Sequence, residues 1–170
     1  MTGLSAVIPT ARLELRPLRI EHAAEMAGVL SDPGLHTFIG GAPLDATALR
    51  ARYERLVAGS PDPEVAWCNW VLHAVAEQCL VGTVQATLSG PTAARTAEVA
   101  WVVGAPWQGR GYATEAARGL VGWLTARSVA EVVAHVHPRH QASAAVARAA
   151  GLTPTGERQD GEIRWRADVA

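Results

Sequence analysis

One loop of this sequence combines the features of an anion-binding turn. Residues 104–114 have the sequence GAPWQGRGYAT and join an apolar run to residues at helical spacing. Gly109 and Gly111 let the backbone approach a ligand closely, and Arg110 between them adds a positive charge. A loop that leads into a helix also exposes the first free N–H groups of that helix, which suit a phosphate. The loop therefore predicts a phosphate-binding site.

Two other interpretations of this loop compete. A dinucleotide fingerprint would place its first glycine directly after a strand and a Gly or Ala at the position of Thr114. Five residues, including Pro106, separate Val103 from Gly109, so the loop fits that fingerprint poorly. A glycine turn that only connects two elements is the plainer alternative, and the loop alone leaves it open.

The composition excludes several classes of chemistry. All 15 basic residues are arginines, and lysine is absent from the chain. Schiff-base enzymes, pyridoxal attachment and Walker-type phosphate loops are excluded because each needs a lysine. The formal net charge of −1, without a basic run, gives no electrostatic footprint for nucleic acid. We therefore expect a small-molecule or peptide partner, with no nucleic acid.

Histidines and cysteines provide weaker candidates. His135 and His137 lie two apart, so on a strand they would face the same side, and His140 follows them closely. Acidic or cysteine ligands do not accompany them locally, so we expect core or cleft histidines and no metal. Cys68 and Cys79 lack the spacing of a disulfide framework or zinc knuckle, which favours small buried hydrophobes. A nucleophile elbow is also missing, so covalent hydrolysis is not indicated.

The elements that position the loop follow from hydropathy patterns. Period-two or β-rich runs predict strands, and apolar residues at helical spacing predict helices, the second of them capped by Asp45. A hairpin should turn at Asp160 and Gly161. Expected strands cover 11–18, 67–74, 79–90, 97–104, 132–138 and the hairpin 155–167, and expected helices cover 20–30, 46–59, 113–124 and 143–150. The order predicts one mixed α+β domain over residues 1–170.

The loop also matches a family signature. Residues 108–113, QGRGYA, match the Gln/Arg-x-x-Gly-x-Gly/Ala pattern of the GNAT superfamily of acyl-CoA-dependent N-acyltransferases. The ordered set ARLELRPLRIEH, DPGLHTFIGGAP, LVGTV, AEVAWVVGAPWQGRGYATEA, VVAHVHPRHQAS and AAGLTPTGE resembles the branch that includes the ribosomal-protein alanine N-acetyltransferases. This resemblance implies an α/β sandwich with a mostly antiparallel sheet, splayed between its fourth and fifth strands and flanked by about four helices.

The resemblance implies that acetyl-CoA binds as co-substrate. Pantetheine would lie between the splayed strands, which agrees with the way an open strand edge binds an amide chain. The backbone N–H near Val103 would then polarise the thioester carbonyl. The implied cofactor-binding residues are Trp101, Val102, Val103, Gly104, Gln108, Gly109, Arg110, Gly111, Tyr112, Ala113, Thr114, His140 and Ser143.

The catalytic candidates are Glu98 and Ser143. Glu98 stands at the family's position for a base that takes the proton of the attacking amine through water, and its alternative is a structural pair with an arginine. Ser143 matches a serine that would hydrogen-bond the CoA sulfur, and its alternative is a helix N-cap. Ala147 stands where many members have a tyrosine acid, and His140 replaces the family's asparagine.

These observations favour an N-acetyltransferase that moves an acetyl group to a primary amine, either a protein N-terminal α-amine or a small molecule, by direct attack in a ternary complex. A non-catalytic acyl-CoA sensor or scaffold module is the alternative, suggested by the missing tyrosine. No secretory leader or membrane span is evident, so we expect a cytoplasmic protein without a membrane partner. The edge near the C-terminal RWRADVA is either short or covered by another subunit, so a homodimer is one of two alternatives that stay open.

Overall fold

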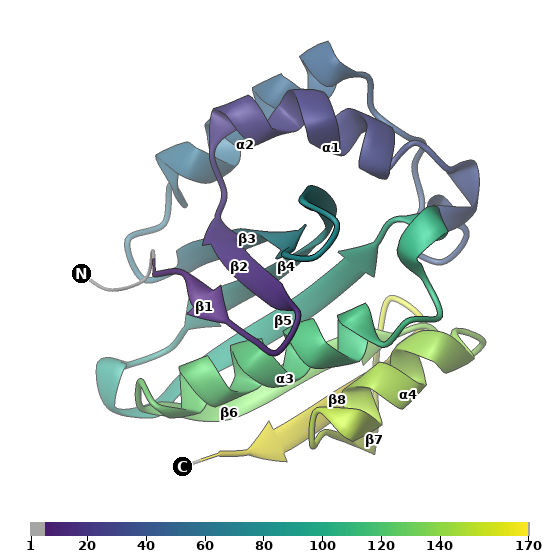
Figure 1. Ribbon diagram of the computed structural model, residues 1–170. Coiled ribbons are helices and arrows are strands. Elements are labelled where there is room, and N and C mark those ends of the chain that lie inside the picture. Colours follow the sequence, from purple (N-terminus) through teal and green to yellow (C-terminus); the bar gives the residue numbers. More distant parts are fainter. Residues whose placement is uncertain (1–5, 170) are drawn as a thin grey trace.

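The computed structural model describes residues 6–169 and contains one mixed sheet of eight strands in the order β1-β2-β3-β4-β5-β6-β8-β7 (Figure 1). Only β5 and β6 pair in parallel among the described strands. The strands are β1 (Ile8–Pro9), β2 (Leu13–Pro17), β3 (Ala66–Ala74), β4 (Cys79–Ser89), β5 (Arg95–Val103), β6 (Val129–Val136), β7 (Thr153–Gln159) and β8 (Glu162–Asp168). The helices are α1 (Ala23–Val29), α2 (Ala46–Ala58), α3 (Tyr112–Thr125) and α4 (Gln141–Ala149).

The helices form two layers on opposite faces of the sheet. Helices α1 and α2 cover one face, and α3 and α4 lie on the other (Figure 1). Strand alternation divides the core accordingly, since Leu72 of β3 packs in the α3 cluster whereas its neighbour Val71 packs against α1 and α2. The mixed α/β sandwich expected from the sequence is thereby confirmed, and none of the described helices is long and apolar enough to cross a membrane.

Several local expectations are confirmed by the backbone. Asp45 caps α2, because its carboxylate accepts a hydrogen bond from the Ala48 N–H at 2.8 Å. The β7–β8 hairpin turns at Asp160 and Gly161, whose φ angles are 50° and 80°. Positive φ at both central residues is what a tight hairpin turn requires.

Other expectations were incomplete. The two-residue strand β1 was not expected, and the first helical segment begins with a 3-10 turn over Ile20–His22 before α1. Strand β6 begins at Val129 rather than 132, and α4 begins at Gln141. Short edge strands and helix ends depend on packing as well as on local pattern, which explains these differences.

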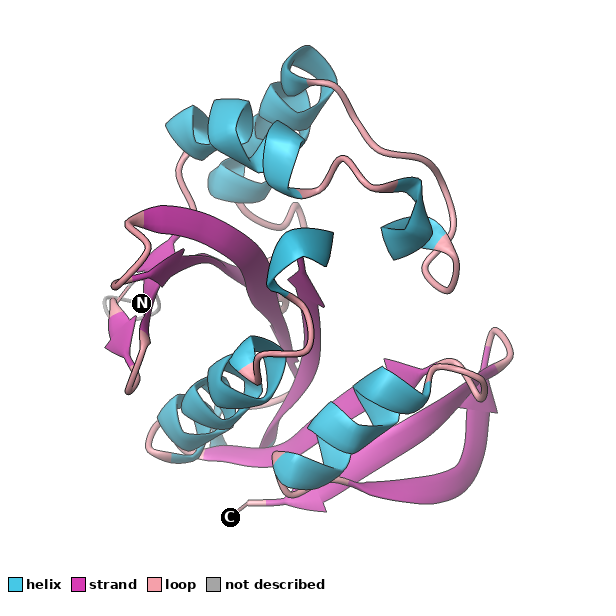
Figure 2. Ribbon diagram, turned by 45° about the vertical axis from the view of Figure 1, so that its right-hand side comes forward, coloured by secondary structure: helices cyan, strands magenta, loops and turns pink. Residues whose placement is uncertain are grey.

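The sheet opens between β5 and β6. The two strands pair only from Arg95 to Glu98 of β5, which lies opposite Val133. Beyond that pair β5 continues to Val103 beside β4, and β6 continues to Val136 beside β8, but β5 and β6 no longer pair with each other. Figure 2 shows the two halves of the sheet diverging. Counted without β1, these are the fourth and fifth strands, so the expected splay is confirmed.

Candidate active site

A cavity of about 800 Å³ lies where β5 and β6 separate, and we call it the β5–β6 cavity. Its walls come from β5, the glycine loop, the end of β6 and the start of α4, with the segment around Phe38 at its rim. The predicted residues Trp101, Val102, Val103, Gln108, Gly109, Gly111, Ala113, Thr114, His140 and Ser143 all line it. Segments that lie far apart in the sequence thus meet around one space.

The backbone of β5 presents free polar groups to this cavity. The Gly104 N–H donates to the Val81 carbonyl at 2.8 Å, and Val103 faces Gly82 in the next register position. Because hydrogen-bonded and non-hydrogen-bonded pairs alternate in an antiparallel ladder, the N–H and C=O of Val103 point away from β4. The Gln108 side-chain amide donates to that carbonyl at 3.0 Å. The Val103 N–H is left to face the open side of β5, as an oxyanion donor requires.

The close approach of β4 and β5 at this point depends on a glycine. A Cβ atom built on Gly82 would lie 2.2 Å from the Val102 carbonyl oxygen, which no side chain can tolerate. Gly82 therefore fixes the path of β5 where it borders the cavity.

The glycine loop delivers the N-terminus of α3 to the same cavity. Gly111, with φ of 81°, is the residue that precedes the helix, and Gly109 has φ of 75°. Positive φ favours glycine at both positions. The N–H groups of the first helical turn, beginning at Tyr112, have no intrahelical acceptor. Together with the helix dipole, they form a cradle that fits a pyrophosphate.

The side chains of Arg110 and Tyr112 take a different direction from the one expected. Arg110 Nη1 donates to Glu77 Oε1 at 2.7 Å, and the Tyr112 hydroxyl donates to the same oxygen at 3.2 Å. The Trp107 indole N–H donates to Glu77 Oε2 at 2.9 Å. The Arg110 charge is thus paired with Glu77, a carboxylate supplied by the turn between β3 and β4, and the assignment of Arg110 to acetyl-CoA stays a prediction. Sequence reasoning missed Glu77, which lies in an ordinary polar turn.

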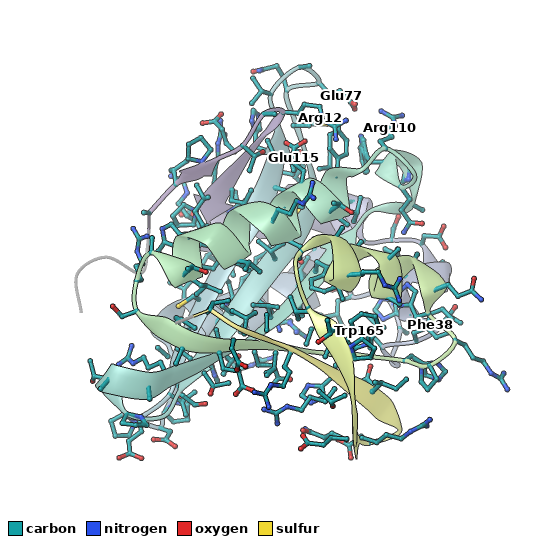
Figure 3. The ribbon with its side chains drawn as sticks, turned by 90° about the horizontal axis from the view of Figure 1, so that it is seen from below. Arg12, Phe38, Glu77, Arg110, Glu115 and Trp165 are labelled. Atoms are coloured by element: carbon teal, nitrogen blue, oxygen red, sulfur yellow. The ribbon has the colours of Figure 1, made fainter. Side chains whose placement is uncertain are left out.

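A second ion pair braces the start of α3 from the side of β2. Arg12 Nε lies 2.8 Å from Glu115 Oε1, and Thr10 donates to the other carboxylate oxygen. Partial burial acts to raise the pKa of Glu115, but the hydrogen bonds from Thr10 and Arg12 hold it below its ordinary value. Figure 3 shows Arg12, Glu77, Arg110 and Glu115 gathered at this end of α3.

Glu98 is paired with a histidine. His135 Nδ1 lies 2.9 Å from Glu98 Oε1, and the alternative of an arginine partner is not what the structure contains. The Glu98 side chain is 51% exposed and does not line the β5–β6 cavity, whereas His135 does. His135 Nε2 is buried and has no hydrogen-bond partner within residues 6–169. The sequence had suggested only a core or cleft role for His135.

Ser143 and His140 lie together at the start of α4. The N-cap interpretation of Ser143 is wrong, because His140 is the residue that precedes the helix. Ser143 Oγ lies 3.4 Å from His140 Nε2, and the His140 ring stacks on Phe38 with centroids 4.5 Å apart. Burial, and then the neighbouring His137, lower the pKa of His140. Ala147 is fully buried, and its methyl side chain supplies no acid.

A second cavity of about 510 Å³ lies on the other face of β5, beneath α2, and we call it the α2 cavity. Residues 100–102 of β5 line both cavities, as do Leu35 and Ile39, so the two spaces adjoin at β5. Tyr53 of α2 lines this space and had not been singled out from the sequence. Among the described residues, no three His, Cys, Asp or Glu side chains are grouped so as to hold a metal ion.

Comparison with known proteins identifies the family. The model of the acetyltransferase (GNAT) domain matches residues 12–153. No curated protein sequence matches the chain. Among solved structures, an acetyltransferase from Agrobacterium tumefaciens is 25% identical, with a TM-score of 0.74 over 95% of this chain and 94% of that one.

Two ribosomal-protein acetyltransferases have similar folds. RimJ of Mycobacterium smegmatis, solved in complex with CoA-disulfide, is 20% identical with a TM-score of 0.79 over 96% of this chain and 88% of that one. The ribosomal-protein-S5-alanine acetyltransferase of Vibrio fischeri is 18% identical with a TM-score of 0.76 over 96% of each chain. The family match spans most of the chain, and it agrees with the splayed sheet and the glycine loop. The chain therefore belongs to the GNAT family of acetyltransferases.

Proposed function

We propose that this protein transfers an acetyl group from acetyl-CoA to a primary amine by direct attack in a ternary complex. The observation that carries this proposal is the meeting of two cavities at residues 100–102 of β5. One cavity has the free backbone groups and helix N-terminus that fit acetyl-CoA, and the other is open to a second substrate. Simultaneous binding on the two faces of β5 places an amine next to a thioester without a covalent enzyme intermediate.

The chain's own groups account for the binding of acetyl-CoA. The free edge of β5 at Trp101 and Val103 fits the pantetheine amides, and the glycine loop at residues 108–114 fits the pyrophosphate. The thioester supplies an electrophilic carbonyl, and the Val103 N–H stabilises the charge that develops on its oxygen. Ser143 lies on the opposite wall, where its hydroxyl can hydrogen-bond the sulfur.

The attacking amine must lose a proton, and we assign this step to the Glu98–His135 pair. Glu98 and Ala100 lie two residues apart on one face of β5, so their Cα atoms are roughly 7 Å apart. One water molecule can bridge the Glu98 carboxylate and an amine bound beside Ala100. His135 orients the carboxylate through its 2.9 Å contact. The proton on the amine nitrogen passes through the water to this pair as the N–C bond forms and the C–S bond breaks.

Membership of the family does not define which amine is acetylated. A protein N-terminal α-amine and a small-molecule amine both fit the reaction, and a cytoplasmic location stays a prediction. The alternative is a sensor that binds acetyl-CoA without turnover, which the alanine at position 147 suggests.

Replacing Glu98 with Gln separates the enzyme from the sensor. In the enzyme, the loss of a general base lowers the rate of acetyl transfer by roughly 100-fold or more at neutral pH while the Kd for acetyl-CoA stays the same. In a sensor, wild type and variant bind acetyl-CoA equally and neither releases free thiol with any amine.

A further inference from the structure

The α2 cavity combines an apolar wall with an uncharged polar floor. Six leucines and Ile39 contribute to the wall, and Asn69, Thr83 and Gln85 lie on the sheet beneath it. None of the described residues lining this cavity is Asp or Glu, and Arg52 is its one permanently charged residue. These features describe the chemistry that a bound amine must match.

The polar floor is a row across three strands. Asn69 of β3 lies opposite Gln85 of β4, and Gln85 lies opposite Ala100 of β5. Side chains opposite one another project from the same face of a sheet, so the two amides stand next to each other and next to the point where the cavities meet. Each amide offers both donors and an acceptor, which suits a ligand group that also donates and accepts.

Tyr53 of α2 lines the same cavity and carries a hydroxyl group. It is 3% exposed, and its hydroxyl is buried without a hydrogen-bond partner in the described part of the chain. Burial raises the pKa of Tyr53 to about 12, so the hydroxyl keeps its proton at neutral pH. A buried hydroxyl without a partner destabilises a protein, and a ligand group that pairs with it removes this penalty.

The absence of acidic lining residues argues against polycationic acceptors. A polyamine or aminoglycoside would place a second ammonium group in this cavity, where it would lose water without gaining a counter-charge. The exposed Arg52 at the cavity adds repulsion toward such a cation. A compound with one amine and an apolar body carries neither penalty.

We propose that the acceptor is the α-amine of an apolar residue whose carboxyl group is in amide linkage. The apolar side chain packs against the leucine wall, the amide group bonds to Asn69, Gln85 and Tyr53, and the amine lies at residues 100–102. This inference rests on the proposed function, because it names the acceptor for that same transfer. The same chemistry occurs in an amino-acid amide and at a polypeptide N-terminus.

The test measures free thiol released from acetyl-CoA with four small amines at neutral pH. Leucinamide carries all the expected groups, glycinamide lacks the apolar side chain, isoamylamine lacks the amide, and spermidine is a polycation. We expect kcat/KM for leucinamide to be at least tenfold higher than for glycinamide or isoamylamine. It should be at least 100-fold higher than for spermidine. A higher kcat/KM for spermidine than for leucinamide overturns the inference.

Two variants test the residues. Tyr53→Phe keeps the ring and removes the hydroxyl, so it should lower kcat/KM for leucinamide about tenfold and leave isoamylamine within twofold. Gln85→Glu supplies the missing carboxylate and should raise kcat/KM for spermidine at least tenfold. Gln159→Glu, an exposed change on β7, is the matched control and should leave kcat/KM unchanged for both leucinamide and spermidine. Equal effects of Gln85→Glu and Gln159→Glu contradict the assignment.

A further pair of substrates identifies the source of the acceptor. A leucine-initiated tetrapeptide that outperforms leucinamide indicates a polypeptide N-terminus, and the reverse order indicates a small molecule; either supports the shared chemistry. Release with spermidine but not leucinamide refutes the acceptor class and leaves the proposed function standing. Binding of acetyl-CoA without release for any amine refutes both.

Discussion

His135 Nδ1 and Glu98 Oε1 lie 2.9 Å apart at the position where β5 and β6 stop pairing. The contact joins the proposed base on β5 to a histidine of β6 that lines the β5–β6 cavity. The two side chains therefore form one hydrogen-bonded unit.

The Glu98–His135 pair predicts non-additive losses of activity. Glu98→Gln and His135→Gln should each lower kcat by about 100-fold, and the double variant should lose little more than either alone, because residues that act as a unit are not independent. The measurement is thiol release with saturating acetyl-CoA over a range of pH. If the two losses multiply in the double variant, the residues act separately and the assignment is wrong.

Glu77 is predicted to position the glycine loop. It accepts hydrogen bonds from Trp107, Arg110 and Tyr112, all of which belong to that loop or the start of α3. Glu77→Gln should raise the Kd for CoA by about five- to tenfold, since charge-assisted hydrogen bonds are weakened, while kcat at saturation stays within twofold.

Titration calorimetry with CoA measures this effect, and Glu64→Gln provides the control because Glu64 is exposed before β3. An unchanged Kd in Glu77→Gln, with normal stability, would show that the loop keeps its shape without this carboxylate.

Gly111 is predicted to be intolerant of a side chain, in contrast to Gly122 on the same helix. Gly111 has φ of +81°, so Gly111→Val should destabilise the fold by roughly 1–2 kcal/mol or more and abolish CoA binding. Gly122 has open space where a Cβ would lie and is helical, so Gly122→Ala should stabilise by about 0.5–1 kcal/mol and leave binding intact. Thermal unfolding and calorimetry measure both, and CoA binding by a folded Gly111→Val protein would contradict the proposed site.

Acidification is predicted to weaken the fold through His140. Its pKa is lowered in the folded state, so the unfolded chain binds the proton more readily. The stabilising contribution is therefore complete above the ordinary value of 6.5 and is lost as the pH falls below it. His140→Asn should reduce the dependence of the free energy of unfolding on pH in this range. Part of that dependence remains, because burial also lowers the pKa of His22. Denaturant unfolding between pH 7.5 and about 5 measures it, and identical slopes would exclude His140 as a source.

Local chemistry made part of this structure predictable. Asp45 before an apolar helical pattern predicts an N-cap, and Asp160-Gly161 predicts a hairpin turn. Both features depend only on neighbours within a few residues. The glycine loop was found for the same reason.

Long-range side-chain pairs could not be predicted in this way. Arg110 binds Glu77 from a different hairpin, and His135 meets Glu98 only because the register of two parallel strands places them together. Neither partner lies near in sequence, so no periodicity indicates it. Ser143 lost its N-cap role because α4 begins two residues earlier than its alanine pattern suggested.

The most direct test of acetyl transfer is the rate of thiol release from acetyl-CoA with and without a primary amine, measured on the wild-type protein. The proposed transfer predicts release that saturates with both substrates and yields one acetylated amine for each thiol. Release that no amine raises above the rate of hydrolysis would contradict it, and would leave the glycine loop as part of a binding module.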